Sequence, residues 1–169
     1  KVEKESIKRA KKILQNMIAQ KGINDLETIK FLTYRKSLFK KADEIDYLIE
    51  KYTEALNTIN WKEDNLDKYF DDIFIDLAGL YTDKKNYDLA INILKQGLDI
   101  AKKNYQNLYF KASYGEILMS YSVMHTLYKN DTVKGYSKLL KSHLSNLDKL
   151  TREDKKKIIK INKNYYLDV

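Results

Sequence analysis

Apolar residues recur at steps of three and four along most of the chain, and the pattern is clearest in residues 74–98, FIDLAGLYTDKKNYDLAINILKQGL. Residues at this spacing share one face of an α-helix, whereas a strand would need strict alternation. Small and charged residues at positions 82–86 interrupt the pattern, which then resumes. The apolar positions are Phe74, Leu77, Ala78 and Tyr81 before the interruption, and Tyr87, Ala90, Ile91, Leu94 and Leu98 after it. The stretch therefore predicts two amphipathic helices joined by a tight turn.

The same periodicity predicts about eight helices in the whole chain, separated by short polar turns. Gly22 is expected to cap the C-terminus of the first helix, because glycine accepts the left-handed conformation that such a cap requires. Asn24 or Asp25 is expected to cap the next helix. Trp61, the only tryptophan, lies in a polar connection, where packing between helix pairs is favoured over stacking on a ligand. The expected helices cover residues 2–20, 24–41, 45–56, 66–81, 87–103, 105–128, 133–147 and 151–165.

Helix pairs with a small residue and large aromatics at fixed offsets are typical of tetratricopeptide (TPR) repeats. Ala55 and Ala90 hold equivalent positions 35 residues apart, and Gly135 holds the next such position a further 45 residues on. We therefore expect an all-α fold, a right-handed superhelical array of antiparallel helix pairs. This TPR-like solenoid would have about three pairs plus terminal helices, in a single domain spanning residues 1–169. The chain begins without Met, so the domain is also compatible with the C-terminal part of a longer chain.

Composition supports the helical prediction and excludes several classes of protein. Proline is absent and glycine occurs only five times among 169 residues, which is too few turn residues for a β-rich fold. Cysteine is absent as well, which excludes disulfides and cysteine-based metal sites and is compatible with the cytoplasm, where we place the protein. No apolar run approaches the roughly 18 residues that span a bilayer, and the first 22 residues lack the apolar core of a signal peptide.

The net charge of +8 is concentrated at the two ends of the chain. Residues 1–21 and residues 138–169 each carry a net charge of +5, whereas the middle of the chain carries −2. A basic excess is typical of nucleic-acid binding, but here it has only three arginines and no interleaved aromatic residues. A solvated helix surface is the favoured interpretation.

Side chains that could carry catalysis or bind metal are sparse. The two histidines, His125 and His143, fall on neighbouring predicted helices and could face each other, but a metal site would need a third ligand. The chain has no nucleophile elbow, no glycine-rich phosphate loop and no Ser/His/Asp arrangement. We therefore expect no enzyme activity, no catalytic residue, no metal and no cofactor.

Candidate binding residues gather on the helices that would line the concave face of a stacked array. Asp72 and Asp76 are an i,i+4 acidic pair that could receive a peptide amine or a lysine, with an ordinary solvated face as the alternative. The fourteen tyrosines offer apolar area with a wet hydroxyl, which suits a peptide groove as well as a core. Asn107 and Lys111, one turn apart, would bind a peptide's main chain and its carboxylate. The expected groove is lined by Tyr69, Asp72, Asp76, Asn107, Lys111, Tyr114 and Tyr121.

Three features within residues 70–142 carry a resemblance to a known family. They are the helix pair FIDLAGLYTDKKNYDLAINILKQGLDIAKK, an extended helix containing LYFKASYGEILMSY, and a further helix with GYSKLL. Together they resemble the helical-repeat receptor domain of Gram-positive peptide-pheromone regulators, the Rgg/PlcR/NprR/Rap group. The resemblance implies the peptide-binding sensor domain of a quorum-sensing-type transcriptional regulator, with homodimerisation through the helical domain. In most such relatives an N-terminal helix-turn-helix binds DNA, and residues 1–41 lack that module.

Two other functions stay open at this point. The chain could be a structural TPR adaptor that holds a larger protein, which predicts an exposed apolar patch outside the groove. It could also be a helical protein that associates with nucleic acid through its basic ends. No membrane partner is expected.

Overall fold

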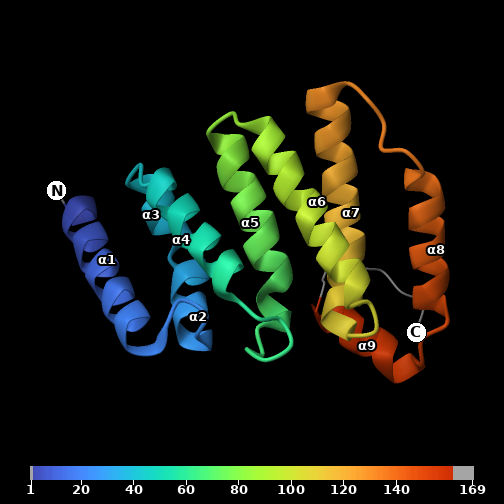
Figure 1. The fold of residues 1–169 in the computed structure, drawn as a ribbon, viewed down its shortest axis with the longest axis horizontal. Coiled ribbons are helices and arrows are strands. Elements are labelled where there is room, and N and C mark those ends of the chain that lie inside the picture. The colour runs from blue at the N-terminus through green and yellow to red at the C-terminus, as the bar shows by residue number, and fades with distance from the viewer. Residues whose placement is uncertain (1, 162–169) are drawn as a thin grey trace. The chain divides into compact units, whose positions relative to one another are not determined.

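A computed structural model describes residues 2–161, and these residues form nine α-helices, one short 3-10 helix and no strand (Figure 1). The prediction of an all-α fold is confirmed. The chain divides into two compact units, residues 1–85 and residues 86–169, and each is described by itself. The helix pair predicted from residues 74–98 falls across this division, so its two helices belong to different units. Tyr165, which was expected in the last helix, lies outside the described residues.

The first unit is built from amphipathic helices that pack in chain order. α1 packs against α2 and α3, α3 packs against α4, and α4 packs against α5. Apolar side chains at three- and four-residue steps face inward, as the periodicity predicted. The elements are α1 (Val2–Lys21), α2 (Leu26–Tyr34), α3 (Lys36–Lys41), α4 (Ile45–Thr58), η1 (Asp67–Tyr69) and α5 (Phe70–Asp83). Fully buried side chains of this core include Leu14, Ile29, Leu32, Phe39, Leu48, Tyr52, Phe70 and Leu77.

Both predicted caps at the first turn are confirmed. Gly22 follows α1 with a φ of +92°, and a Cβ added there would lie 2.9 Å from the Asn24 Oδ1. The Asp25 carboxylate accepts hydrogen bonds from the backbone N–H groups of Glu27 (3.0 Å) and Thr28 (3.4 Å). These two residues therefore set where α1 ends and where α2 begins.

The prediction of one continuous helix over residues 24–41 is wrong. The helix stops at Tyr34, and α3 begins at Lys36 after a break at Arg35. Thr33 lies just before the break, and its hydroxyl donates to the carbonyl oxygens of Ile29 (3.0 Å) and Lys30 (3.1 Å). Such a side-chain bond competes with the backbone ladder in the last turn of a helix. The break gives α3 a direction of its own.

Trp61 packs against aromatic residues of α5. Its ring meets Phe70 edge-on, with centroids 5.1 Å apart, and its centroid lies 6.3 Å from that of Phe74. Phe70 and Phe74 lie 4.8 Å from each other, so the three rings form one aromatic cluster at the start of α5. This arrangement supports the packing interpretation of Trp61 over ligand stacking.

The second unit is organised around the long helix α7. α6 and α7 form its most extensive contact, and at one end of this pair the rings of Tyr87 and Tyr128 stack with centroids 3.7 Å apart. Asp88 and Lys129 form an ion pair at the same end. Because these contacts join the start of α6 to the end of α7, the two helices are antiparallel. The elements are α6 (Tyr87–Lys103), α7 (Leu108–Lys129), α8 (Tyr136–Asp148) and α9 (Arg152–Ile161).

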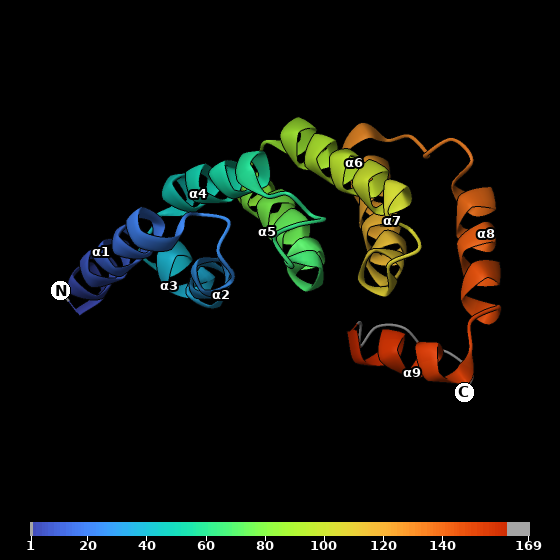
Figure 2. The ribbon, with the colours of Figure 1, turned by 60° about the horizontal axis from the view of Figure 1, so that its bottom comes forward.

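Within the second unit, α9 bridges α8 and the beginning of α7, as Figures 1 and 2 show. Ala112, Leu147 and Ile158, one from each of the three helices, are fully buried together. Thr151 caps α9, because its hydroxyl accepts a hydrogen bond of 3.1 Å from the Asp154 N–H. The contact fixes α8 near the beginning of α7. Farther along α7, three apolar side chains four residues apart are exposed, namely Met119 (50%), Val123 (55%) and Leu127 (67%).

Gly135 does not take the small-residue packing position that its spacing from Ala90 predicted. It lies outside α8, at the N-cap, with a φ of +74°, and nothing lies within 4 Å of an added Cβ. Ala90, by contrast, is fully buried inside α6. The glycine therefore serves the backbone of the turn and not a close approach of two helices.

No helix in the described part of the chain is long and apolar enough to cross a bilayer.

Candidate functional site

A pocket of about 320 Å³ lies within the second unit, between the end of α6, the beginning of α7 and α8. Tyr114 and His143 are buried, whereas Lys102 and Ser142 are exposed. Leu139 adds an apolar wall from α8. The residues that line the pocket are Lys102, Tyr105, Tyr114, Leu139, Ser142, His143 and Asn146.

The polar side of the pocket is a hydrogen-bonded chain centred on Tyr105. The Tyr105 hydroxyl and the His143 Nδ1 are 2.5 Å apart. A hydrogen bond from Asn146 lowers the pKa of Tyr105, as expected when the amide donates to the phenol oxygen, although burial of the ring raises that pKa overall. The direction of the bond between the phenol and the imidazole follows the histidine tautomer: the phenol donates to Nδ1 when the imidazole proton is on Nε2.

His143 is a neutral imidazole at pH 7. Burial and the nearby Lys111 ammonium lower its pKa to about 4. The centroid of the Tyr114 ring lies 5.1 Å from that of the imidazole and 5.4 Å from that of the Tyr105 ring. Tyr114 therefore packs against both residues that form the hydrogen bond. Burial also raises the pKa of Tyr114. The pocket therefore holds an uncharged histidine, and this group is not poised to exchange protons near neutral pH.

Lys111 lies directly behind the tyrosine wall of the pocket. The residue is only 8% exposed, and its Nζ lies 5.1 Å from the centroid of the Tyr105 ring. Its charge reaches the pocket, since it lowers the pKa of His143. No carboxylate of the described residues forms an ion pair with Lys111. A cation over a ring is stabilised by about 0.5–2 kcal/mol, which does not neutralise it.

The arrangement suits binding more than catalysis. Aromatic and aliphatic walls with a few convergent polar groups are typical of ligand pockets, and the volume lies near the small end of their range. The strongest nucleophile or base candidate, His143, is held neutral by burial and by the charge of Lys111. Among the described residues no group of three or more His, Cys, Asp or Glu side chains could hold a metal ion.

Two of the predicted groove residues on α7, Lys111 and Tyr114, lie at this pocket. Asn107 is instead the N-cap of α7, since its side-chain oxygen accepts from the N–H groups of Tyr109 (2.8 Å) and Phe110 (3.4 Å). Tyr121 lies two turns farther along α7 from Tyr114, where its ring contacts His125 at 5.6 Å. The expectation that the two histidines could face each other finds no support, because the aromatic contacts of each lie with tyrosines.

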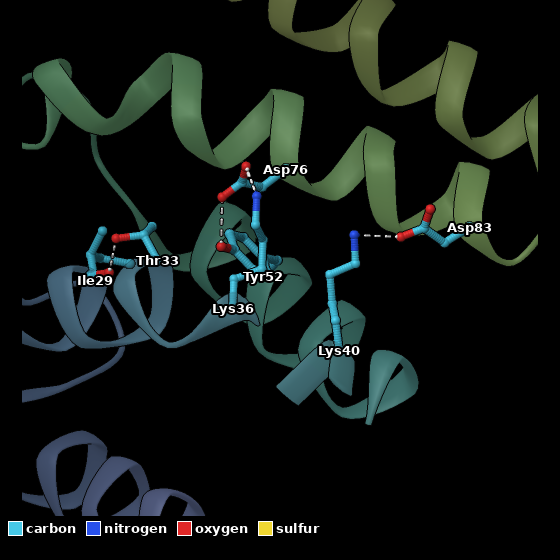
Figure 3. Close-up of polar contacts among 7 residues, drawn as sticks. All are labelled: Ile29, Thr33, Lys36, Lys40, Tyr52, Asp76 and Asp83. Carbon is cyan, nitrogen blue, oxygen red and sulfur yellow. Dashed lines mark hydrogen bonds and ion pairs between the residues drawn. The ribbon is translucent and has the colours of Figure 1, made fainter. Parts of the chain in front are cut away.

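The predicted groove residues of the first unit have partners within that unit. Figure 3 shows the Asp76 carboxylate between the Lys36 Nζ at 2.6 Å and the Tyr52 hydroxyl at 2.9 Å. Burial and Asp76 raise the pKa of Tyr52. Asp72 is exposed one turn before Asp76. Tyr69 is only 5% exposed, and burial together with a hydrogen bond to Tyr34 raises its pKa.

The single groove containing all seven residues stays a prediction. Asp76 is committed to Lys36 and Tyr52, so its two oxygens hold helices together before any peptide arrives. Asn107 is likewise committed to the first turn of α7.

Sequence reasoning missed most of the α8 side of the pocket. Leu139, Ser142, His143 and Asn146 follow the three- and four-residue steps of a single helix face, which is the signal that could have grouped them. Tyr105 was placed at the start of the long helix, whereas α7 begins at Leu108. That shift puts Tyr105 in the connection between α6 and α7, where its ring can turn toward α8.

The chain matches no protein-family model, no curated protein and no solved structure.

Proposed function

We propose that this chain is a non-enzymatic helical binding module that holds a short peptide segment, with one residue of the segment seated in the pocket of the second unit. The observation that carries the proposal is the pocket of about 320 Å³ between α6, α7 and α8, lined by two tyrosines, a leucine and a neutral histidine. Such walls take an apolar side chain, while the neighbouring polar groups orient the main chain.

The pocket volume favours one residue of an extended segment over a large folded partner. The pocket of about 320 Å³ lies at the small end of the usual 300–1,000 Å³ range for ligand pockets. A peptide gains further contacts along the helices outside the pocket, so its affinity does not depend on the pocket alone.

The proposal agrees with the sequence resemblance to peptide-sensing helical repeats. In that form, the helix pairs would stack as a TPR-like superhelix, and the peptide would signal to a transcription regulator in the cytoplasm. A DNA-binding module and a homodimer belong to this wider proposal, and both stay predictions.

A pocket-filling substitution tests the proposal. Ser142→Trp would place an indole in the pocket mouth, whereas Ser145→Trp, at a second exposed serine of α8, would leave the lining unchanged. The probe is a library of heptapeptides with free termini, captured on the immobilised chain and identified by mass spectrometry. We expect the wild type and Ser145→Trp to retain the same peptides and Ser142→Trp to lose at least tenfold in recovery. Equal recovery by both variants, or no peptide retained by the wild type, would overturn the proposal.

A protein-holding adaptor is the second candidate, and one observation favours it. Met119, Val123 and Leu127 form an exposed apolar row on α7, outside the pocket. Exposed apolar rows of this kind mark protein–protein contacts more often than scattered single residues do. A complex recovered by pull-down that survives Ser142→Trp and is lost in Val123→Glu would support the adaptor function over the peptide-binding one.

A further inference from the structure

Two lysines of the described residues place positive charge at the pocket of the second unit. Lys102 lines the pocket at the C-terminal end of α6, and Lys111 lies behind the Tyr105 ring. Among the described residues that line the pocket there is no Asp or Glu. Because Lys111 is nearly buried, its field is screened less by solvent than that of a surface lysine.

The structure assigns this pocket to an amphipathic monocarboxylate, that is, a carboxylate carried on a short branched or aromatic group. The inference rests on the proposed function in taking the pocket as a ligand site, and it names the chemistry of the ligand. The carboxylate would compensate Lys111 and Lys102, and the apolar group would lie against Tyr114 and Leu139. Two sources share this chemistry, namely the C-terminal residue of a peptide and a free carboxylic acid.

The hydrogen-bonding capacity of the lining explains why charge, and not a neutral amide, is selected. The Tyr105 hydroxyl is already shared between His143 and Asn146. A neutral amide entering the pocket would lose water, which costs about 1–3 kcal/mol for each polar group left unpaired. A carboxylate meets the same loss but gains charge-assisted contact with an ammonium group in return.

The type of cation favours a carboxylate over a phosphate. Phosphate sites usually use arginine forks or clustered backbone N–H groups. The three arginines of the chain are Arg9, Arg35 and Arg152, and none of them lines the pocket. One lysine in the lining and one behind an aromatic ring match one negative charge with an apolar body better than they match a compact, strongly hydrated dianion.

A matched pair of probes tests the inference on the full chain by ¹⁵N-NMR titration at fixed salt and pH 7. N-acetyl-L-leucine and N-acetyl-L-leucinamide differ only in the carboxylate. We expect shifts in residues around the pocket, with the acid binding at least tenfold more tightly than the amide. We expect Lys111→Met to remove at least fivefold of the acid's affinity and to leave the amide unchanged. The control Lys103→Met, at an exposed lysine that does not line the pocket, should bind both probes as the wild type does.

A second variant and two further probe molecules complete the experiment. Lys102→Met provides a second charge deletion in case Lys111→Met does not fold. Equal affinity for the acid and the amide, or inorganic phosphate competing as well as the acid, would overturn the inference. If 4-methylpentanoate binds as tightly as N-acetyl-L-leucine, the inference holds and the ligand is a free carboxylic acid. If it binds more weakly, the inference holds and the ligand is the C-terminal residue of a peptide. If the peptide library fails while the acid still binds, the proposed function fails and the carboxylate site stands.

Discussion

Each unit of the molecule places a poorly exposed lysine over a tyrosine ring, and the two lysines differ in what else surrounds them. In the first unit, the Lys51 Nζ lies 5.4 Å from the centroid of the Tyr47 ring and also 3.4 Å from a Glu54 carboxylate oxygen. In the second unit, the Lys111 Nζ lies 5.1 Å from the Tyr105 centroid, with no carboxylate partner among the described residues.

The two tyrosines also differ in the hydrogen bonding of their hydroxyl groups. The Tyr47 hydroxyl is buried without a hydrogen-bond partner among the described residues, whereas the Tyr105 hydroxyl bonds to His143 and Asn146 beside an open pocket. In the first unit, therefore, the lysine is neutralised and the phenol merely packs. In the second unit, the phenol is held in place, and no carboxylate of the described residues pairs with the lysine beside the cavity. A nearly buried cation without a carboxylate partner among the described residues can gain from an anionic ligand, whereas a paired cation cannot.

The largest expected effect is a loss of stability of the second unit in acid. The pKa of His143 is about 4 in the folded chain because the side chain is buried and near Lys111, against about 6.5 in an unfolded chain. Between these two values the unfolded chain binds the proton and the folded chain does not. Stability therefore falls as the pH drops from about 6.5 to about 4, by about 3 kcal/mol from this group. Hydrogen exchange of α8 amides from pH 7 to pH 4 measures the loss.

The variant His143→Gln is the reference for that measurement, because carboxylates also titrate in this range. Both histidines lie in the second unit, so amides of α4 should show no comparable difference between wild type and variant. If the exchange rates of α8 amides change with pH in the same way in the wild type and in His143→Gln, then His143 does not cause the loss of stability.

A smaller effect is expected from the paired charges of the first unit. Asp76→Asn removes the partner of Lys36 and weakens the acceptor of the buried Tyr52 hydroxyl, and we expect about 2 kcal/mol of lost unfolding free energy. Asp83 supplies the matched control, since it also joins α5 to α3 through a lysine, Lys40, at 2.8 Å (Figure 3). That pair is 39–40% exposed, so Asp83→Asn should cost less than about 1 kcal/mol.

Urea unfolding in low and high salt checks this comparison. High salt should remove most of the small loss of unfolding free energy caused by Asp83→Asn. It should leave most of the loss caused by Asp76→Asn, because buried charges are screened less. Equal costs for the two substitutions would mean that burial does not distinguish these contacts.

The sequence predicted the helices well because their stability depends on local periodicity. The ends of α1 and α2 followed from Gly22 and Asp25, whose effects act within a few residues. The break at Arg35 was missed because a threonine such as Thr33 does not by itself predict a helix end. Threonine also occurs inside unbroken helices, where its hydroxyl faces solvent. Gly135 was misassigned because spacing alone does not distinguish a packing glycine from one with a positive φ.

The candidate site was predictable only in part, because its residues meet through tertiary packing. Lys111 and Tyr114 were named from their place on α7, but Tyr105 and His143 come together only after α8 returns along α7. Asp76 was predicted to bind a ligand, but it bonds to Lys36 and Tyr52 within the fold. These partners lie 40 and 24 residues away in the sequence, so no local pattern predicts the contacts.

The smallest expected effect separates the two lysines by the sign of a stability change. Lys51→Met removes the partner of Glu54, and we expect a loss of about 0.5–1 kcal/mol of unfolding free energy. Lys111→Met replaces a nearly buried cation by an apolar side chain of similar length, and we expect no loss or a gain of up to about 1 kcal/mol. Hydrogen exchange of α4 and α7 amides in both variants measures the two changes in their own units. If Lys111→Met destabilises α7 as Lys51→Met destabilises α4, then Lys111 is already neutralised within the fold. A carboxylate ligand would in that case have no unmet charge to find in the pocket.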